Sequence, residues 1–338
     1  MPRMAAATLA VLGGALVLPT SAQAERPASD PEAIAMVARA IGAPATVSFT
    51  GTQFVAAWSA MDRSESTSMM VDVEHAAGGS TIVRAHGSGV VARLAPPDGS
   101  AWLAPGGPVE LLTAAHSLTV GGGAEIAGRS AVVIDAVRAD GTLAARLWLD
   151  DEMAVPLRRE VYDASGMTIT ASAFVDISLE YGNPDAAGVT TSRPSAPKTL
   201  GLAELAALRA DGWACPRELA PGMALYEAKQ VGSAVQLSYT DGVAAVSVFE
   251  QPGRLDPAAL DGFAEHPAGR GVYYRAPGPP SRFVWETADH VVTVIADAPA
   301  MVDAVLAILP PEANESAGFL AQIGRGAQRL MSWVNPFD

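Results

Sequence analysis

Alternation of apolar and polar residues with period two dominates the sequence from Thr46 to Leu179. The clearest run is Met167–Ile177, in which residues 167, 169, 171, 173, 175 and 177 are apolar and are predicted to share one face. Period two is the repeat of a β-strand, because successive side chains point to opposite faces. Tight turns such as Asp140–Gly141 and Ser165–Gly166 join the strands. Parallel strands need long crossovers, so these turns predict an antiparallel sheet, curved or covered on its apolar face.

The composition changes after residue 182. The segment 183–198 is rich in proline, serine and small residues without periodicity, and it is predicted to be a linker. Beyond it, helical spacing of leucines begins at Leu202, strand patterns follow, and Asp241-Gly242 is a strong hairpin signal. A second helix is predicted at 298–309. The chain is therefore predicted to be an α+β protein, with a sheet domain at 30–182 and a smaller α+β domain at 199–310.

The two ends of the chain have their own patterns. Residues 1–24 carry a basic end, an apolar core and a small-residue cleavage site, which predict a signal peptide; a retained anchor is the alternative. The tail, 311–338, places apolar residues near one helical face, with Arg325 and Arg329 elsewhere on the turn. Such a segment either docks on its own domain or lies on an anionic membrane surface. We expect an exported protein of the periplasm or extracytoplasmic cell envelope.

Charge and cysteine content exclude some classes. The net charge is −14, which argues against nucleic acid as a partner, because such proteins cluster lysine and arginine. Cys215 is the single cysteine, so no intrachain disulfide forms. Its expected role is that of a small buried apolar residue beside Trp213 rather than a reactive thiol.

No catalytic, cofactor or metal site is predicted. The five histidines are scattered without the spacing of metal ligands, and His75, at a strand end, is expected to be solvated. Asp150, Asp151 and Glu152 cluster in a predicted hairpin tip, where a solvated turn is favoured over a Ca²⁺ site. Since no nucleophile, base and orienting group can be nominated, the protein is not expected to be an enzyme.

Apolar residues are the remaining candidates for function. Methionine-rich patches adapt to irregular apolar partners, so a cavity for acyl chains or lipidated protein is set against ordinary core packing. The candidate cavity residues are Trp58, Met69, Val71, Met167, Ile169, Ala171, Ala173 and Val175.

Four stretches resemble one family. The run WLDDEMAVPLRREVYDASG, from Trp148, resembles the hairpin of the MucB/RseB family of sigma-E regulatory proteins. FTGTQFVAAW and ASAFVDISL are similar to further strands of the same sheet. The segment from Asp211 through LSYTDGVAAVSVFEQPGRL is similar to the family's second domain. The resemblance covers most of the predicted mature chain, in the family's order.

This resemblance implies a fold and a function. The fold implied is an antiparallel half-barrel like that of the lipoprotein carriers LolA and LolB, followed by the smaller domain. The function implied is regulatory: binding the extracytoplasmic segment of a membrane anti-sigma factor, shielding it from proteolysis, and releasing it in response to lipid or lipoprotein. The alternative is a carrier of lipid or lipoprotein. Arg158, Arg159 and Tyr162, expected on the outer side of the hairpin, are candidate partner-binding residues, although each is also explained as a solvated strand residue.

Overall fold

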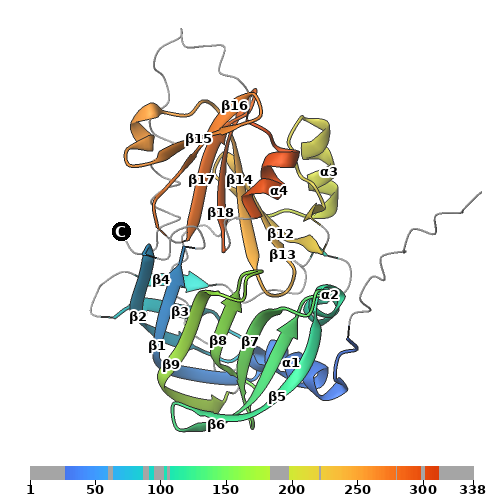
Figure 1. Ribbon diagram of the computed structural model, residues 1–338, viewed down its shortest axis with the longest axis vertical. Coiled ribbons are helices and arrows are strands. Elements are labelled where there is room, and N and C mark those ends of the chain that lie inside the picture. The colour runs from blue at the N-terminus through green and yellow to red at the C-terminus, as the bar shows by residue number, and fades with distance from the viewer. Residues whose placement is uncertain are drawn as a thin grey trace, which may run out of the picture.

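Two antiparallel sheets, each with its own core, make up the described part of the chain (Figure 1). The computed structural model describes residues 27–59, 64–86, 91–94, 103–104, 107–182, 198–220, 222–278, 280–297 and 301–311. The first sheet lies within residues 27–182, here called the N-terminal unit. The second lies within residues 198–311, the C-terminal unit. The predicted signal peptide, nearly all of the predicted linker and the amphipathic tail beyond Pro311 fall outside the described residues.

The first sheet has nine strands in the order β4-β3-β2-β1-β9-β8-β7-β6-β5, all paired antiparallel. The first strand, β1, lies beside the last, β9, and this central pair is flanked by β2–β4 on one side and β5–β8 on the other. The strands are β1 (Val47–Trp58), β2 (Ser66–His75), β3 (Thr81–Ala85), β4 (Val91–Leu94), β5 (Ser117–Ile126), β6 (Arg129–Val137), β7 (Leu143–Asp150), β8 (Pro156–Tyr162) and β9 (Thr168–Tyr181). The antiparallel open sheet confirms the predicted fold class.

Two helices cover one face of this sheet, which we call the helix-side face. They are α1 (Pro31–Gly42), continued by the 3₁₀ turn η1 (Ala43–Ala45), and α2 (Pro108–Ala115). Proline in the first turn starts both helices, where its missing N–H costs no hydrogen bond. The shared core contains Ala33, Met36, Val37, Leu112, Leu118, Ile134, Ala136, Ala144, Ala145, Leu149, Ala154, Val161, Ile169 and Val243.

Two bulges in β9 interrupt the predicted alternation. Opposite β8, Val161 pairs with Thr170 and Tyr162 with Thr168, which leaves Ile169 as the extra residue. Opposite β1, Gln53 pairs with Phe174 and Thr52 with Asp176, so Val175 is extra. Each bulge shifts the period by one residue and reverses which side chains face the core. The expectation that the apolar residues of 167–177 share one face is therefore wrong.

The second sheet also has nine strands, in the order β10-β12-β13-β14-β18-β17-β16-β15, with β11 paired to β12. The strands are β10 (Lys198–Thr199), β11 (Glu218–Ala220), β12 (Met223–Val231), β13 (Ala234–Thr240), β14 (Ala245–Pro252), β15 (Ala264–Ala268), β16 (Gly271–Arg275), β17 (Ser281–Glu286) and β18 (His290–Ala296). Helices α3 (Leu202–Ala210) and α4 (Met301–Ile308) and the 3₁₀ turn η3 (Pro257–Leu260) complete the unit. The predicted helices and the Asp241-Gly242 hairpin are confirmed.

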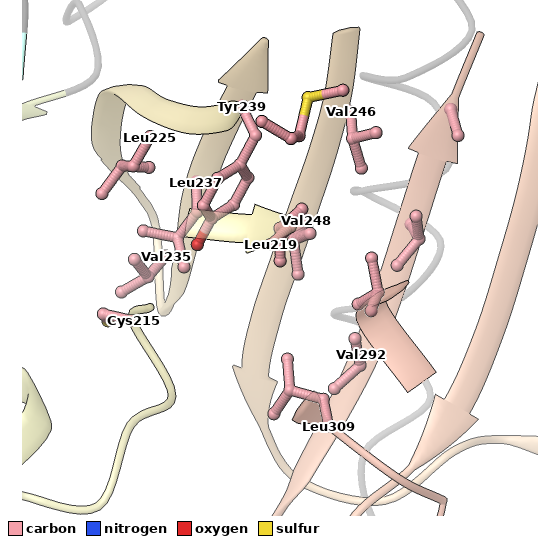
Figure 2. Close-up of a cluster of buried hydrophobic side chains, with 14 of the residues drawn as sticks. Cys215, Leu219, Leu225, Val235, Leu237, Tyr239, Val246, Val248, Val292 and Leu309 are labelled. Atoms are coloured by element: carbon pink, nitrogen blue, oxygen red, sulfur yellow. The ribbon is translucent and has the colours of Figure 1, made fainter. Parts of the chain in front are cut away.

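The core of the C-terminal unit lies on one face of this sheet and includes residues of α3, β11 and α4 (Figure 2). Tyr239 and Trp285 are fully buried in it, and each satisfies its polar atom on a backbone carbonyl: the Tyr239 hydroxyl on Pro216 at 2.9 Å and the Trp285 indole N–H on Leu309 at 2.8 Å. Cys215 is buried beside Trp213, as expected, and burial raises the pKa of its thiol to about 11. The thiol is therefore protonated and unreactive at neutral pH.

Glu250 is a carboxyl group on the core side of β14. It is 2 % exposed, its two oxygens accept the Ala214 N–H at 3.2 and 3.1 Å, and the His290 Nδ1 lies 3.7 Å away. Burial raises the pKa of Glu250 to about 7, although the Ala214 N–H opposes the shift. Burial also lowers the pKa of His290, so the pair does not provide a stable ion pair at neutral pH.

Glu250→Gln is predicted to change how stability depends on pH. Because the folded-state pKa is raised, the wild-type carboxyl is most favourable below about pH 4.5 and loses that advantage as the pH rises through about 7. The loss is on the order of 3 kcal/mol at most. The glutamine variant keeps the acceptor for Ala214 without the charge. Its melting temperature should stay flatter than that of the wild type between pH 5 and 8; parallel curves would contradict the assignment.

Candidate functional site

The predicted cavity residues do not form one surface. Cross-strand partners point to the same side of a sheet, so the register assigns each residue a face. Met69, Val71 and Ile169 lie on the helix-side face or pack with residues that do. Trp58, Ala171 and Ala173 lie on the opposite face, here called the outer face. The bulged Val175 is 58 % exposed and Met167 is 47 % exposed. The residue that fills the core in place of Val175 is Phe174.

A row of polar and aromatic side chains crosses the outer face on β7 and β8. Arg158 pairs with Trp148 in register, and its guanidinium carbon lies 4.5 Å from the centre of the indole ring, a cation–π contact. Arg158 also donates to Glu160, which accepts a second hydrogen bond from the Tyr162 hydroxyl. Burial alone would raise the pKa of Glu160, but the hydrogen bonds from Tyr162 and Arg158 outweigh it and lower that pKa. Glu160 is therefore ionised and holds both neighbours in place.

Arg159 does not lie on the outer face, where it was expected. It pairs with Leu147 and Ser172 on the helix-side face, and it is partly buried. Its guanidinium donates a hydrogen bond to the carbonyl oxygen of Val243, a residue of the C-terminal unit. Alternation along β8 explains the difference, because adjacent residues of a strand must point to opposite faces. Arg158 and Tyr162 share the outer face, and Arg159 belongs to the contact between the two units.

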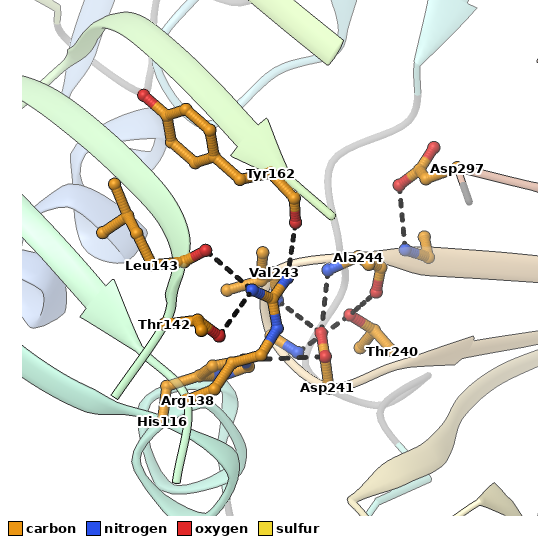
Figure 3. Close-up of polar contacts among 12 residues, drawn as sticks. His116, Arg138, Thr142, Leu143, Tyr162, Thr240, Asp241, Val243, Ala244 and Asp297 are labelled. Carbon is orange, nitrogen blue, oxygen red and sulfur yellow. Dashed lines mark hydrogen bonds and ion pairs between the residues drawn. The ribbon is translucent and has the colours of Figure 1, made fainter. Parts of the chain in front are cut away.

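That contact is built around the tip of the β13–β14 hairpin, residues 241–244, which we call the hairpin tip (Figure 3). The Asp241 carboxylate accepts the N–H groups of Val243 and Ala244 at 2.9 and 2.8 Å, which fixes the shape of the tip. Val243 is buried in the core beneath α1 and α2. The imidazole Nε2 of His116, at the end of α2, lies 3.7 Å from the Asp241 carboxylate. The hairpin tip thus adds a polar and an apolar contact to the helix-side face.

Arg138 holds together two strand ends of the N-terminal unit that are drawn beside the hairpin tip (Figure 3). Its guanidinium donates to the carbonyl oxygens of Leu143 at 2.7 Å, Tyr162, and Asp163 at 3.2 Å. These acceptors belong to the ends of β7 and β8, so one side chain ties two strand ends together. These hydrogen bonds keep the ends of β7 and β8 in fixed positions, so the surface beside the hairpin tip has a fixed shape.

Gly242 brings the hairpin tip into close contact with α2. A Cβ atom added at this position would lie 2.7 Å from the Cα of Leu112, which is closer than two carbon atoms can approach. Its φ of +90° is also in the region that glycine alone adopts without strain. Glycine is therefore required here on two independent grounds. The Asp-Gly pair in the sequence predicted the turn, but it did not indicate that Leu112 of the N-terminal unit would lie against it.

Two further contacts join the units. The Arg275 guanidinium donates to the hydroxyl of Ser59 at 3.1 Å and lies 3.3 Å from the Glu65 carboxylate. The Leu103 N–H donates to the Tyr226 carbonyl at 2.8 Å, and the Leu103 side chain packs on the core of the C-terminal unit. The junction therefore has three anchor points supplied by different strands of the second sheet.

Asp150 and His75 have structural roles. Asp150 is buried and accepts two hydrogen bonds from Arg129, at 2.6 and 3.1 Å, so the expectation of a fully solvated turn is wrong for this residue. His75 is also buried rather than solvated: its ring contacts the Thr81 hydroxyl at 2.9 Å and the Pro44 carbonyl at 2.8 Å. Within the described ranges, no group of three or more His, Cys, Asp or Glu residues is placed to hold a metal ion. No helix in the same ranges is long and apolar enough to cross a membrane.

A comparison with known protein families finds one match, which lies mostly in the N-terminal unit. The model of the MucB/RseB N-terminal domain matches residues 72–194. The matched segment runs from β2 through β9 and includes Trp148, Arg158 and Tyr162, together with Arg159, which contacts the hairpin tip. No curated protein matches the chain.

Solved structures extend the likeness beyond this domain. A crystal structure of MucB shares the fold, with a TM-score of 0.53 and 18 % identity, over 85 % of this chain and 100 % of that chain. The complex of MucA and MucB from Pseudomonas aeruginosa is similar at a TM-score of 0.48 and 20 % identity, over 83 % of this chain and 99 % of that chain. A LolA superfamily protein from Nitrosomonas europaea is similar at a TM-score of 0.20 and 10 % identity, over 78 % of this chain and 90 % of that chain. The crystal structure of MucB, with its TM-score above 0.5, therefore shows the same fold over both units.

Gly242→Ala is predicted to open the junction, and Gly232→Ala is its matched control. Both glycines end a strand of the same sheet at positive φ, but a Cβ at Gly232 would meet nothing within 4 Å. Each substitution should cost about 1 kcal/mol of backbone strain. The first should in addition push α2 away and raise the radius of gyration measured by small-angle X-ray scattering. Identical scattering curves for the two variants would show that the hairpin tip does not press on Leu112.

Proposed function

We propose that this protein is an extracytoplasmic regulatory protein that binds the extracytoplasmic segment of a membrane anti-sigma factor and responds to lipid or lipoprotein. The observation that carries the proposal is the match to the MucB/RseB N-terminal domain at 72–194, in a chain whose fold over both units is that of MucB. MucB itself has been solved in a complex with MucA. Export to the periplasm or extracytoplasmic envelope belongs to the same proposal, because its partner would be reached only there.

The outer-face row supports a protein partner more than a substrate. Arg158 and Tyr162 are residue types that supply much of the binding energy in protein interfaces, and the buried Trp148 supports Arg158 through the cation–π contact. Glu160 holds Arg158 and Tyr162 in fixed positions, so little conformational freedom would be lost on binding. In a chain whose net charge is −14, an arginine held over an indole ring is a distinctive feature for a partner to recognise.

Titration calorimetry with the extracytoplasmic peptides of the host's membrane anti-sigma proteins tests the proposal. Micromolar or tighter binding of one peptide is the expected result. Arg158→Ala should weaken that binding at least tenfold, because it removes both the guanidinium and its support on Trp148. Arg84→Ala is the control, since its side chain is 42 % exposed against 40 % for Arg158 and is likewise paired with a glutamate.

The results separate the proposal from its alternatives. Equal loss in the two variants would mean that the partner does not use the outer-face row. Absence of binding to every peptide would contradict regulation through an anti-sigma factor. If the protein then transferred acyl cargo between vesicles, the carrier function would replace the regulatory one.

A further inference from the structure

The two faces of the second sheet differ in what covers them. Helices α3 and α4 pack on the face that carries the core of the C-terminal unit (Figure 1). The opposite face is here called the back face. Because cross-strand partners share a face, the register assigns to it two neighbouring rows, one with Phe249, Thr293 and Val284 and one with Ser247, Ile295 and Arg282. Neither row contributes a residue to the core of the unit.

Two large apolar residues of the back face are nevertheless buried. Phe249 is 8 % exposed and Val284 is 5 % exposed, although both side chains point away from the core. Ile295 and Val291 lie beside them and are partly buried. The free face of an antiparallel sheet normally carries polar residues, so these apolar residues indicate that an apolar partner packs on the back face. Neither α3 nor α4 is that partner, because both pack on the other side.

The chain leaves the described part of the C-terminal unit at the end of this sheet. Leu309 follows α4, and its carbonyl oxygen accepts the indole N–H of Trp285 at 2.8 Å. Trp285 lies one residue before the end of β17, so Pro310 and Pro311 lie near that end of the sheet. Residues 312–315 can span about 13 Å when extended, and packed layers lie about 10 Å apart. The chain can therefore pass from the core side to the back face.

The tail that follows has the pattern and the length of a helix that fits this face. On a helical projection of residues 316–334, the large apolar side chains fall within about one third of the circumference, and Arg325, Arg329 and Ser332 lie opposite. Such a helix is about 28 Å long, and the eight residues of β14 extend over about 26 Å. The segment that precedes the unit, 183–197, contains Val189 as its single large apolar residue. The apolar stripe of the tail consists of Phe319, Leu320, Ile323, Ala327, Leu330, Met331 and Val334.

The charge of the tail favours docking on the protein over docking on an anionic membrane. Residues 312–338 contain Arg325 and Arg329 against Glu312, Glu315 and Asp338, which gives a net charge of 2 − 3 = −1. Helices that lie on anionic lipid depend on an excess of lysine and arginine. The apolar stripe is thus the feature of the tail that can bind, and it needs an apolar surface.

We propose that the tail, residues 312–338, docks as an amphipathic helix on the back face, with its apolar stripe over Phe249, Val284 and Ile295. The sheet of the C-terminal unit is then covered on both faces, by α3 and α4 on one and by the tail on the other. The side of the tail helix that carries the arginines faces water. This docking does not rest on the proposed function, and it means that a partner approaching this side of the unit meets the tail rather than the bare sheet.

Hydrogen exchange of the tail amides in residues 25–338, without lipid, tests the proposal. An isolated helix of this length that contains Gly324 and Gly326 is marginal in water, so protection requires docking. The amides of residues 319–334 should exchange at least about tenfold more slowly than those of an unstructured peptide. Leu330→Asp, on the apolar stripe, should abolish this protection, and Ser332→Asp, on the opposite side, should keep it.

Thr293→Lys locates the surface, because it places a charge between Phe249 and Val284. It should remove the protection of the tail. Thr52→Lys is the control, at a threonine of β1 that is partly buried like Thr293 but belongs to the first sheet, and it should leave the tail protected. If Thr293→Lys does not fold, Ser247→Lys in the neighbouring row of the back face replaces it.

Four results would overturn the proposal. Unprotected tail amides in the wild type would do so, as would protection that appears only with phosphatidylglycerol vesicles, which would place the tail on the membrane. Protection that survives both Thr293→Lys and Ser247→Lys would place the tail elsewhere on the protein. Exposed tail amides together with a dimer that Thr293→Lys dissociates in sedimentation would show that a second copy of the chain covers the back face.

Discussion

Contact between the hairpin tip and α2 determines how the two sheets are arranged. Gly242 approaches the backbone of Leu112 so closely that a methyl group would not fit, and Val243 enters the core beneath α1 and α2. Those helices cover one face of the first sheet but leave Arg159 to be covered by the second unit. A residue of the C-terminal unit thus completes the core of the N-terminal one. This packing couples the two units, because separation would expose the apolar side chain of Val243 and leave Arg159 without its hydrogen-bond acceptor.

Much of the fold was predictable because strands and turns are encoded locally. The strand patterns, the Asp241-Gly242 turn and the helices at Leu202 and Met301 are all present. The bulges in β9 were not predictable from alternation, since a bulge is fixed by its partners on neighbouring strands. One signal was available: Phe174 breaks the apolar alternation, and it is buried where Val175 is exposed. The helix α1 also had a signal, in Ala33, Met36 and Val37 at helical spacing, which the strand-based interpretation did not use.

The candidate site was also only partly predictable, because it too depends on contacts between residues that are far apart in the sequence. Alternation along β8 requires Arg158 and Arg159 to point to opposite faces, so two adjacent arginines could not share one role. Which face was outer depended on where α1 and α2 pack, and that is a long-range property. The outer arginine is balanced by Glu160 from its own strand, and the inner one by the Val243 carbonyl of another unit. A local partner is visible in sequence as spacing, whereas a distant one is not.

The most direct measurement of the central claim is amide hydrogen exchange of the full chain without ligand, comparing two turns of the same sheet. Residues 241–244 form the hairpin tip, and residues 232–233 form the β12–β13 turn. Isolated hairpin turns exchange rapidly because their amides open to water easily. If the tip is buried against the N-terminal unit, the amides of Val243 and Ala244 exchange far more slowly than that of Ser233, and α2 is protected along with them. Equally fast exchange at both turns would contradict the account.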